Sequence, residues 1–173
     1  IIKKLNGHTP KFGKNCFLAD NAAIIGDVEM GNDCSIWFGA VLRGDVHSIR
    51  IGNKVNIQDN ATIHATYKKS PTNIGNNVSI AHNAVIHGCT IKDNVLIGMG
   101  AIVLNGAKIG RDCIVGAGAL VTGKMDAPDG SMILGSPAKV VRPLKPEEIE
   151  GNRAAMEEYL EAAAQYRKEQ EVR

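Results

Sequence analysis

The sequence predicts an all-β solenoid of hexapeptide repeats, followed by one C-terminal α-helix. An aliphatic residue recurs at every sixth position over most of residues 18–123, glycine often follows it, and a small or β-branched residue often stands four positions after it. A helix favours a period near 3.6 and a simple strand a period of two, whereas a period of six indicates coils with three flat faces. The aliphatic series consists of Leu18, Ile24, Met30, Ile36, Leu42, Ile51, Ile57, Ile63, Ile74, Ile80, Ile86, Ile91, Ile97, Val103, Ile109, Val115 and Val121.

Each predicted coil takes three hexapeptides, with the aliphatic residues inside and the glycines easing the corners. The pattern dissolves after Gly123, and Pro146 followed by two glutamates suits the first turn of a helix, whose positive end favours acids. We therefore expect a single domain over residues 1–173. It should contain a solenoid over about residues 11–125, a return segment over 126–145, and a helix over 146–170 that packs back along the solenoid.

Two insertions interrupt the repeat. The spacing between Leu42 and Ile51 is nine positions instead of six. The spacing between Ile63 and Ile74 is eleven. Because insertions in solenoids become loops, often at the working surface, we expect function near these two points.

Composition argues against several classes of function. The formal net charge is +2 and no block of Lys or Arg stands out, which disfavours nucleic acid or a membrane surface as a partner. No stretch reaches the roughly 20 apolar residues that span a bilayer, and the first residues lack the apolar core of a signal peptide. The four cysteines show no C-x-x-C spacing, so we expect reduced packing residues in a cytoplasmic protein.

Counting hexapeptides places three histidines on the predicted faces. Arg43, His64 and His87 each stand one position after an aliphatic residue of the same face, so they form a column with about 4.8 Å per coil. His82 belongs to a different face and lies directly above Asp59 of the preceding coil. Two stacked imidazoles at this spacing can both bind one zinc ion at about 2.0–2.1 Å.

The spacing alone leaves two interpretations open, a metal site and a packing ladder. Solenoid faces also stack polar side chains without any ligand, and a single histidine is more often a hydrogen-bonded surface residue, which is how we interpret His8 and His47. His82 can join the other two histidines only across an interface between chains, or if the inserted loop at residues 66–73 distorts the coil.

Four segments carry a resemblance to a known family. They are Arg43-Gly44-Asp45, Asn56-Ile57-Gln58-Asp59-Asn60, Ile63-His64 and Ala81-His82-Asn83-Ala84-Val85-Ile86-His87-Gly88. Together they resemble the γ-class carbonic anhydrases, and the resemblance runs from about Leu18 to the C-terminal helix. The hexapeptide by itself is less specific, because acyltransferases share it, as they share the segment of residues 135–139.

The resemblance implies a left-handed parallel β-helix that assembles as a homotrimer with an active site at each subunit interface. His64 and His87 would bind the metal from one chain, and His82 from its neighbour. The metal would be Zn²⁺, with Fe²⁺ and Co²⁺ as alternatives because imidazole suits all three. A metal-bound hydroxide would hydrate CO2 to bicarbonate reversibly, so the implied substrate is a small molecule.

The resemblance also implies roles for residues around the metal. Gln58 would hydrogen-bond the metal-bound water or hydroxide. Arg43 and Asp59 would pair, and Asp45 would support the arginine at the interface. Tyr159 on the C-terminal helix would approach the site, or would serve only to pack the helix.

The sequence departs from better-characterised active members at the mouth of the site, where those proteins carry glutamates that help to export the proton. Val46 follows Asp45, and residues 65–70 contain no acid, as in the short-loop branch of the family. We therefore expect slow CO2 hydration that rises with buffer concentration. Two other functions stay open: a hexapeptide acyltransferase with a histidine general base, and a non-catalytic scaffold in which the metal clips subunits together.

Overall fold

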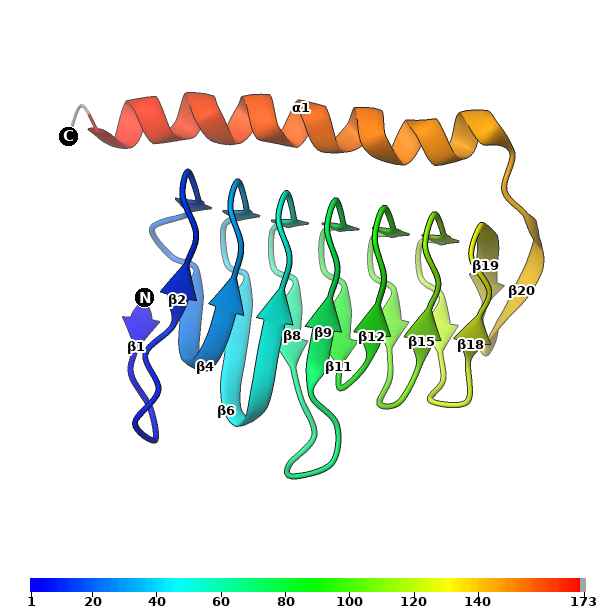
Figure 1. Cartoon of the computed structure of the whole chain (residues 1–173), viewed down its shortest axis with the longest axis horizontal. Coiled ribbons are helices and arrows are strands. Elements are labelled where there is room, and N and C mark those ends of the chain that lie inside the picture. Colours follow the sequence, from blue (N-terminus) through cyan, green and yellow to red (C-terminus); the bar gives the residue numbers. More distant parts are fainter. Residues whose placement is uncertain (172–173) are drawn as a thin grey trace.

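The computed structural model, which describes residues 1–171, is a parallel β-solenoid with one long helix lying along it (Figure 1). The solenoid of hexapeptide coils is the predicted left-handed β-helix, and the C-terminal helix returns along its length. All paired strands are parallel except the last two, which form an antiparallel hairpin at the end of the solenoid. The predicted fold class is therefore confirmed.

One face of the solenoid is an eight-stranded sheet that lies beneath the helix. Its strands are β3 (Phe17–Leu18), β5 (Ser35–Ile36), β7 (Asn56–Ile57), β10 (Ser79–Ile80), β13 (Leu96–Ile97), β16 (Ile114–Val115), β19 (Ser131–Gly135) and β20 (Ala138–Pro143). The expected return segment thus contains regular strands, and strand pairing continues to Pro143.

The other two faces form one twelve-stranded sheet because two long strands, β4 (Ala23–Met30) and β6 (Val41–Ile51), run around the corner between them. One of these faces contains β1 (Ile2–Lys3), β8 (Thr62–His64), β11 (Val85–His87), β14 (Ile102–Val103) and β17 (Leu120–Val121). The other contains β2 (Lys11–Phe12), β9 (Thr72–Ile74), β12 (Thr90–Ile91), β15 (Lys108–Ile109) and β18 (Asp126–Ala127). The three residues inserted after Leu42 therefore lengthen a strand and do not form the expected loop.

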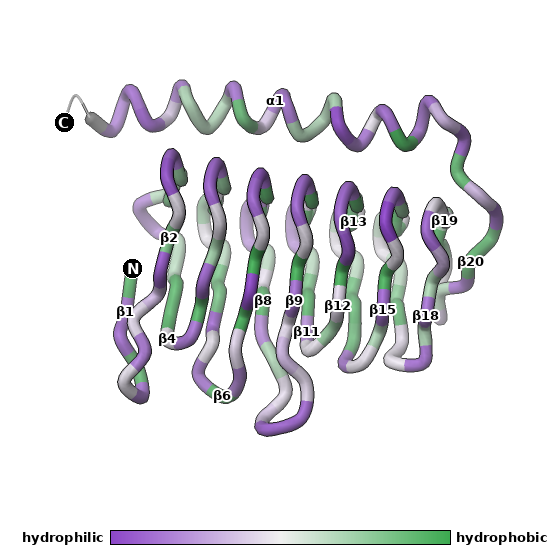
Figure 2. The backbone as a smooth tube through the Cα atoms, in the orientation of Figure 1, coloured by the Kyte–Doolittle hydropathy of each residue, from purple (hydrophilic) through white to green (hydrophobic). Residues whose placement is uncertain are grey.

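The core is a set of aliphatic columns in the predicted register. Leu42 pairs with Ile63, and Ile63 pairs with Ile86, in neighbouring strands of one face. All three side chains are fully buried. Hydrophobic segments recur at the same level from coil to coil in Figure 2. Each buried isoleucine or leucine contributes about 1.5–3 kcal/mol through the hydrophobic effect, so the coils hold one another together.

One corner of the solenoid is closed by a column of asparagine and aspartate side chains. Asn53 Oδ1 accepts a hydrogen bond of 2.8 Å from the Asn32 N–H, and Asn76 Oδ1 accepts one of 2.8 Å from the Asn53 N–H. The preceding glycines leave room for these side chains, since a Cβ atom on Gly52 would lie 2.5 Å from Asn76 Oδ1. The recurrent glycine therefore reflects close approach of the next coil.

The helix α1 (Pro146–Glu171) begins at the predicted proline, with two glutamates in its first turn. Met156 and Ala163 are buried against the eight-stranded sheet. A polar residue is buried with them: Asn152 Nδ2 donates to the carbonyl oxygens of Asn94 and Cys113, at 3.1 and 3.2 Å. Hydrogen bonds to the solenoid backbone therefore fix the position of the helix along the coils, in addition to apolar packing.

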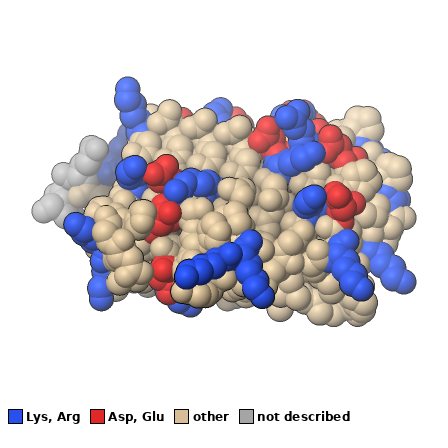
Figure 3. Space-filling view, turned by 60° about the horizontal axis from the view of Figure 1, so that its bottom comes forward, with Lys and Arg blue, Asp and Glu red and all other residues tan. Residues whose placement is uncertain are grey.

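The surface carries charges of both signs. Acidic and basic side chains are interspersed on the face shown in Figure 3. Within residues 1–171, no helix is long and apolar enough to cross a membrane.

Candidate metal centre

His64 and His87 lie side by side on neighbouring strands. The strands β8 and β11 are paired in parallel with His87 opposite His64, as the repeat predicts. Their ring centroids are 4.9 Å apart with an interplanar angle of 66°, and His64 Nδ1 lies 3.0 Å from His87 Nε2. Two ligands of a tetrahedral zinc ion at about 2.0–2.1 Å are separated by about 3.3 Å. The separation of the facing nitrogens is therefore close to that of two ligand atoms in the coordination sphere of such an ion.

The other nitrogen of each ring has its own partner. His64 Nε2 lies 2.9 Å from Asp45 Oδ1, and His87 Nδ1 lies 2.5 Å from Asn105 Oδ1. Arg43 Nη1 donates to Asp45 Oδ2 at 2.5 Å. Burial raises the pKa of Asp45, but the hydrogen bonds from His64 and Arg43 outweigh burial and lower the pKa below its usual value. Asp45 is thus held as a carboxylate that orients His64.

The insertion after His64 returns to brace both histidine strands. The Thr72 hydroxyl donates to the His64 carbonyl oxygen and accepts a hydrogen bond of 2.9 Å from the Gly88 N–H. Thr72 is fully buried at the start of β9. One side chain therefore links the backbone at His64 to the backbone directly after His87.

His82 lies elsewhere, on the turn between β10 and β11. Its Nδ1 is 2.9 Å from Asp59 Oδ2, and the Asn83 N–H donates to the Asp59 carbonyl oxygen at 3.0 Å, so His82 stands one coil beyond Asp59 as predicted. The His82 side chain is 40% exposed. Within residues 1–171, the Nε2 atom of His82 has no hydrogen-bond partner.

Gln58 and Tyr159 belong with His82. Gln58, beside Asp59, is 5% exposed, and its Nε2 donates to Asn56 Oδ1 at 3.0 Å. Burial raises the pKa of Tyr159, and the Asp59 carboxylate raises it further. The Tyr159 ring also packs edge-on against Trp37, with centroids 5.6 Å apart.

The predicted residues therefore fall into two groups. The paired-histidine half consists of Arg43, Asp45, His64 and His87, and the single-histidine half consists of Gln58, Asp59, His82 and Tyr159. Within residues 1–171 of one chain, no three His, Cys, Asp or Glu side chains are arranged to hold a metal ion. The predicted pairing of Arg43 with Asp59 is likewise not formed within the chain, where Arg43 pairs with Asp45.

Two other histidines lie outside both halves. His8 and His47 line a cavity of about 170 Å³ together with Asp27 and Asp45. His47 Nδ1 accepts a hydrogen bond of 2.9 Å from the Ser48 N–H. His8 Nδ1 lies 3.9 Å from Asp27 Oδ1. His47 is thus a hydrogen-bonded residue and His8 an exposed residue beside Asp27, as the sequence predicts.

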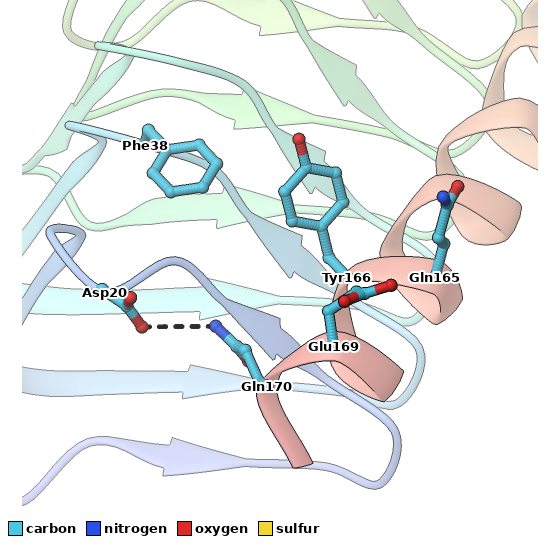
Figure 4. Close-up of a pocket in the computed structure, with 6 residues that line it drawn as sticks. All are labelled: Asp20, Phe38, Gln165, Tyr166, Glu169 and Gln170. Carbon is cyan, nitrogen blue, oxygen red and sulfur yellow. Dashed lines mark hydrogen bonds between the residues drawn. The ribbon is translucent and has the colours of Figure 1, made fainter. Parts of the chain in front are cut away.

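A cavity of about 400 Å³ lies between the C-terminal part of α1 and the first coils (Figure 4). Phe38 and Tyr166 face each other across it, with ring centroids 5.9 Å apart, and Gln170 Nε2 lies 3.4 Å from Asp20 Oδ1. No residue of the paired-histidine or single-histidine half lines this cavity. The two groups of histidines therefore lie outside this cavity.

Sequence reasoning assigned no role to three residues that support the site: Asn56, Thr72 and Asn105. Asn105 could have been found by counting. It stands two positions after Val103, as Gly88 stands two positions after Ile86, so Asn105 lies one coil beyond Gly88, the residue after His87. Thr72 could not, because its position depends on the path of the inserted loop.

Comparison with known proteins places the chain among hexapeptide-repeat proteins. Residues 9–44 and 88–123 match the family model described as bacterial transferase hexapeptide (six repeats). The intervening segment contains all three histidines of the two halves. A crystal structure of a hexapeptide transferase family protein from Anaplasma phagocytophilum superposes with a TM-score of 0.91 at 38% identity, over 96% of this chain and 98% of that one.

Relatives with similar sequences carry a more specific name. The carbonic anhydrase of Geobacillus kaustophilus (strain HTA426) is 40% identical over 100% of this chain and 94% of the relative. Gamma carbonic anhydrase 2, mitochondrial, of Arabidopsis thaliana is 42% identical over 82% of this chain. The chain spans about half the length of this and a second Arabidopsis relative, 52% and 53%.

Proposed function

The chain belongs to the γ-class carbonic anhydrase family of hexapeptide-repeat proteins, and on that premise we propose that it catalyses the reversible hydration of CO2 to bicarbonate at a metal site shared by two copies of the chain. One observation carries the proposal. The facing nitrogens of His64 and His87 are 3.0 Å apart, while the outer nitrogens of both rings have oxygen partners. Metal-binding histidines characteristically engage their second nitrogen in this way.

The third ligand is His82 of a second copy. Arg43 and His64 follow each other in one column, and Asp59 and His82 follow each other in the other. If the single-histidine half of one chain docks on the paired-histidine half of its neighbour, His82 reaches the histidine pair and Asp59 approaches Arg43. Two complementary pairs in one arrangement support this docking. The contact joins two different surfaces, and a three-fold ring can close such a contact, so we propose the homotrimer that the family resemblance implies.

A divalent ion bound by three imidazoles would supply Lewis-acid chemistry that makes water easier to ionise near neutral pH. Zn²⁺ fits this donor set, and Fe²⁺ and Co²⁺ fit it as well. His64, His82 and His87 would hold the ion. Asp45 and Asp59 would keep two of the rings in place through their hydrogen bonds of 2.9 Å.

The remaining residues of the two halves bind and orient the reactants. The Gln58 amide, with its Nε2 held by Asn56, would present its oxygen to the attacking water and so fix the direction of its lone pair. Arg43 would join the two chains by pairing with Asp45 of its own chain and Asp59 of the neighbour. Tyr159, which packs against Trp37 one coil before Gln58, would line the edge of the site.

The proposal is tested by purifying the chain anaerobically and measuring metal content and CO2 hydration on the same sample. We expect about one divalent ion per chain, loss of both metal and activity after chelation, and a rate that rises with buffer concentration. A fully metal-loaded protein that hydrates no CO2 in any buffer would instead identify a scaffold. Tight coenzyme A binding that does not depend on metal would identify an acyltransferase, the activity named for several fold relatives.

A further inference from the structure

The two stacked histidines present different nitrogens to each other. His64 faces its neighbour with Nδ1, whereas His87 faces it with Nε2. A neutral imidazole has one protonated nitrogen and one with a free lone pair, and only the free lone pair binds a metal. Whatever holds the proton on the outer nitrogen of each ring therefore decides whether that ring is ready to bind.

For His64 the outer partner is a carboxylate, Asp45, which only accepts hydrogen bonds when ionised. For His87 it is the side-chain amide of Asn105, whose Oδ1 lies 2.5 Å from Nδ1. An amide oxygen also only accepts, so in this contact His87 Nδ1 carries the proton and Nε2 keeps its lone pair. If the amide were reversed, its NH2 group would donate to Nδ1 and the proton would move to Nε2, which would prevent metal binding.

The register of the repeat places Asn105 next to His87. Ile86 pairs with Val103, and the Gly106 N–H donates to the Gly88 carbonyl oxygen at 2.8 Å, so Asn105 lies one coil beyond the His87–Gly88 turn. Within residues 1–171, the Asn105 side chain makes one hydrogen bond, and its partner is His87. The corner asparagines differ, because Asn53 Oδ1 accepts from a backbone N–H of the neighbouring coil.

We propose that Asn105 is a positioning residue for His87. It fixes the tautomer with the proton on Nδ1, and the ring rotation in which Nε2 faces His64 Nδ1. The proposal rests on the proposed metal site. Loss of a hydrogen-bond partner of this kind costs roughly tenfold to a hundredfold in metal affinity.

Three variants test this role: Asn105→Ala, Asn105→Asp and, as a matched control, Asn53→Ala. Each protein is made metal-free and titrated with Co²⁺, and its thermal unfolding is recorded. We expect Asn105→Ala to bind Co²⁺ roughly tenfold to a hundredfold more weakly. Asn105→Asp should bind within a few-fold of the unmodified chain, because a carboxylate can only accept the Nδ1 proton. Asn53→Ala should unfold at a lower temperature and keep its Co²⁺ affinity.

A second readout needs no metal. In the metal-free chain labelled with ¹⁵N-histidine, at a pH where the imidazoles are neutral, the nitrogen shifts of His87 should report the Nδ1-protonated tautomer. Asn105→Ala should shift the population toward the Nε2-protonated form, and Asn105→Asp should not. If His87 is Nε2-protonated in the unmodified chain, or if Asn105→Ala changes neither the tautomer nor the affinity, the assignment is wrong. If the unmodified chain binds no Co²⁺ at all, the proposed function fails, while the tautomer measurement still tests Asn105.

Discussion

Each histidine of the candidate site has one ring nitrogen within hydrogen-bond distance of a side-chain oxygen, and this contact orients the ring. Asp45 faces His64, Asp59 faces His82, and each is within 2.9 Å of the ring. These contacts fix which nitrogen points outward before any ion arrives, so less entropy is lost on binding. The same contacts explain why a carboxylate appears in each of the two halves.

Replacing either stacked histidine of the proposed metal site should remove most of the bound metal. In His64→Ala or His87→Ala one of three nitrogens is missing, so affinity should fall by more than the roughly tenfold to hundredfold that loss of an outer partner costs. The control is His47→Ala, whose Nδ1 accepts from the Ser48 N–H and lies 3.4 Å from Ser48 Oγ, with no contact to the stacked pair in the described structure. Metal analysis after dialysis decides: full occupancy in either ligand variant would remove that residue from the site.

The register of the repeat predicts the stacking of His64 on His87, and strand pairing confirms it. The same counting places His82 above Asp59. Counting could not predict that Asp45 reaches His64, because that contact depends on how the lengthened strand β6 bends around the corner. Register is a property of the repeat, whereas the path of an insertion is decided by tertiary contacts.

Glycine is required for close packing in the coils but only lowers stability in the helix, and one substitution in each element tests this difference. A Cβ atom at Gly52 would lie 2.5 Å from Asn76 Oδ1 and 2.7 Å from the Gly75 carbonyl oxygen, whereas one at Gly151 in α1 meets nothing within 4 Å. Gly52→Ala should therefore destabilise the chain by about 1–3 kcal/mol through overpacking. Gly151→Ala should stabilise it by about 0.5–1 kcal/mol, because alanine is the better helix former. Denaturant unfolding measures the change in stability of both variants. A stabilising Gly52→Ala would contradict the close approach of the next coil at this corner.

The stability that the start of α1 contributes should fall in acid. Two hydrogen bonds from Arg142, at 2.7 and 2.8 Å, and one from the Lys145 N–H lower the pKa of Glu148 to about 2. A carboxyl group whose pKa is lower in the folded chain stabilises the fold above its ordinary pKa of about 4.3 and loses that contribution as the pH falls toward 2. Thermal stability should decline across that window.

Glu148→Gln supplies the control for this acid response. It should start from a slightly lower melting temperature at neutral pH and show a shallower decline between about pH 4.3 and pH 2. Thermal melts followed by circular dichroism at a series of pH values provide the comparison. Equal slopes in both proteins would show that the ion pair with Arg142 does not brace the helix.

The helix itself illustrates what sequence patterns reveal and what they leave out. Pro146 and the acids after it predict where the helix begins, and α1 begins there. The expected packing of the helix along the solenoid is seen at Met156, which is 1% exposed. Asn152, buried between Asn94 and Cys113, could not be predicted, because its partners are backbone carbonyl groups of the coils.

Across the whole molecule, the two histidine columns continue into exposed apolar residues. Met99 stands one coil beyond His82 and is 58% exposed. Leu104 stands one coil beyond His87 and is 37% exposed. The docking that brings His82 to the histidine pair would also bring Met99 of one chain against Leu104 of its neighbour, so the proposed interface would combine a polar site with an apolar end.

Met99→Glu should therefore weaken the assembly. A lone charge against Leu104 is costly, and sedimentation equilibrium should show a shift toward single chains. Val141→Glu, at a residue that is 51% exposed on β20, is the matched control and should leave the assembly intact. Adding Leu104→Lys to Met99→Glu should restore assembly in part, because opposite charges would then meet across the contact. A Met99→Glu chain that assembles normally would place the interface elsewhere.

Mixing two inactive variants tests whether two chains complete the proposed metal site. His64→Ala and His82→Ala should each be metal-poor, but unfolded together in equal amounts and refolded, they should regain metal and CO2 hydration at about a quarter of the sites, since random assembly gives half times half. A mixture of His64→Ala with His87→Ala should regain nothing, because every chain then lacks one of the paired histidines. If mixed assemblies of His64→Ala and His82→Ala form and regain nothing, the site is not shared in this way.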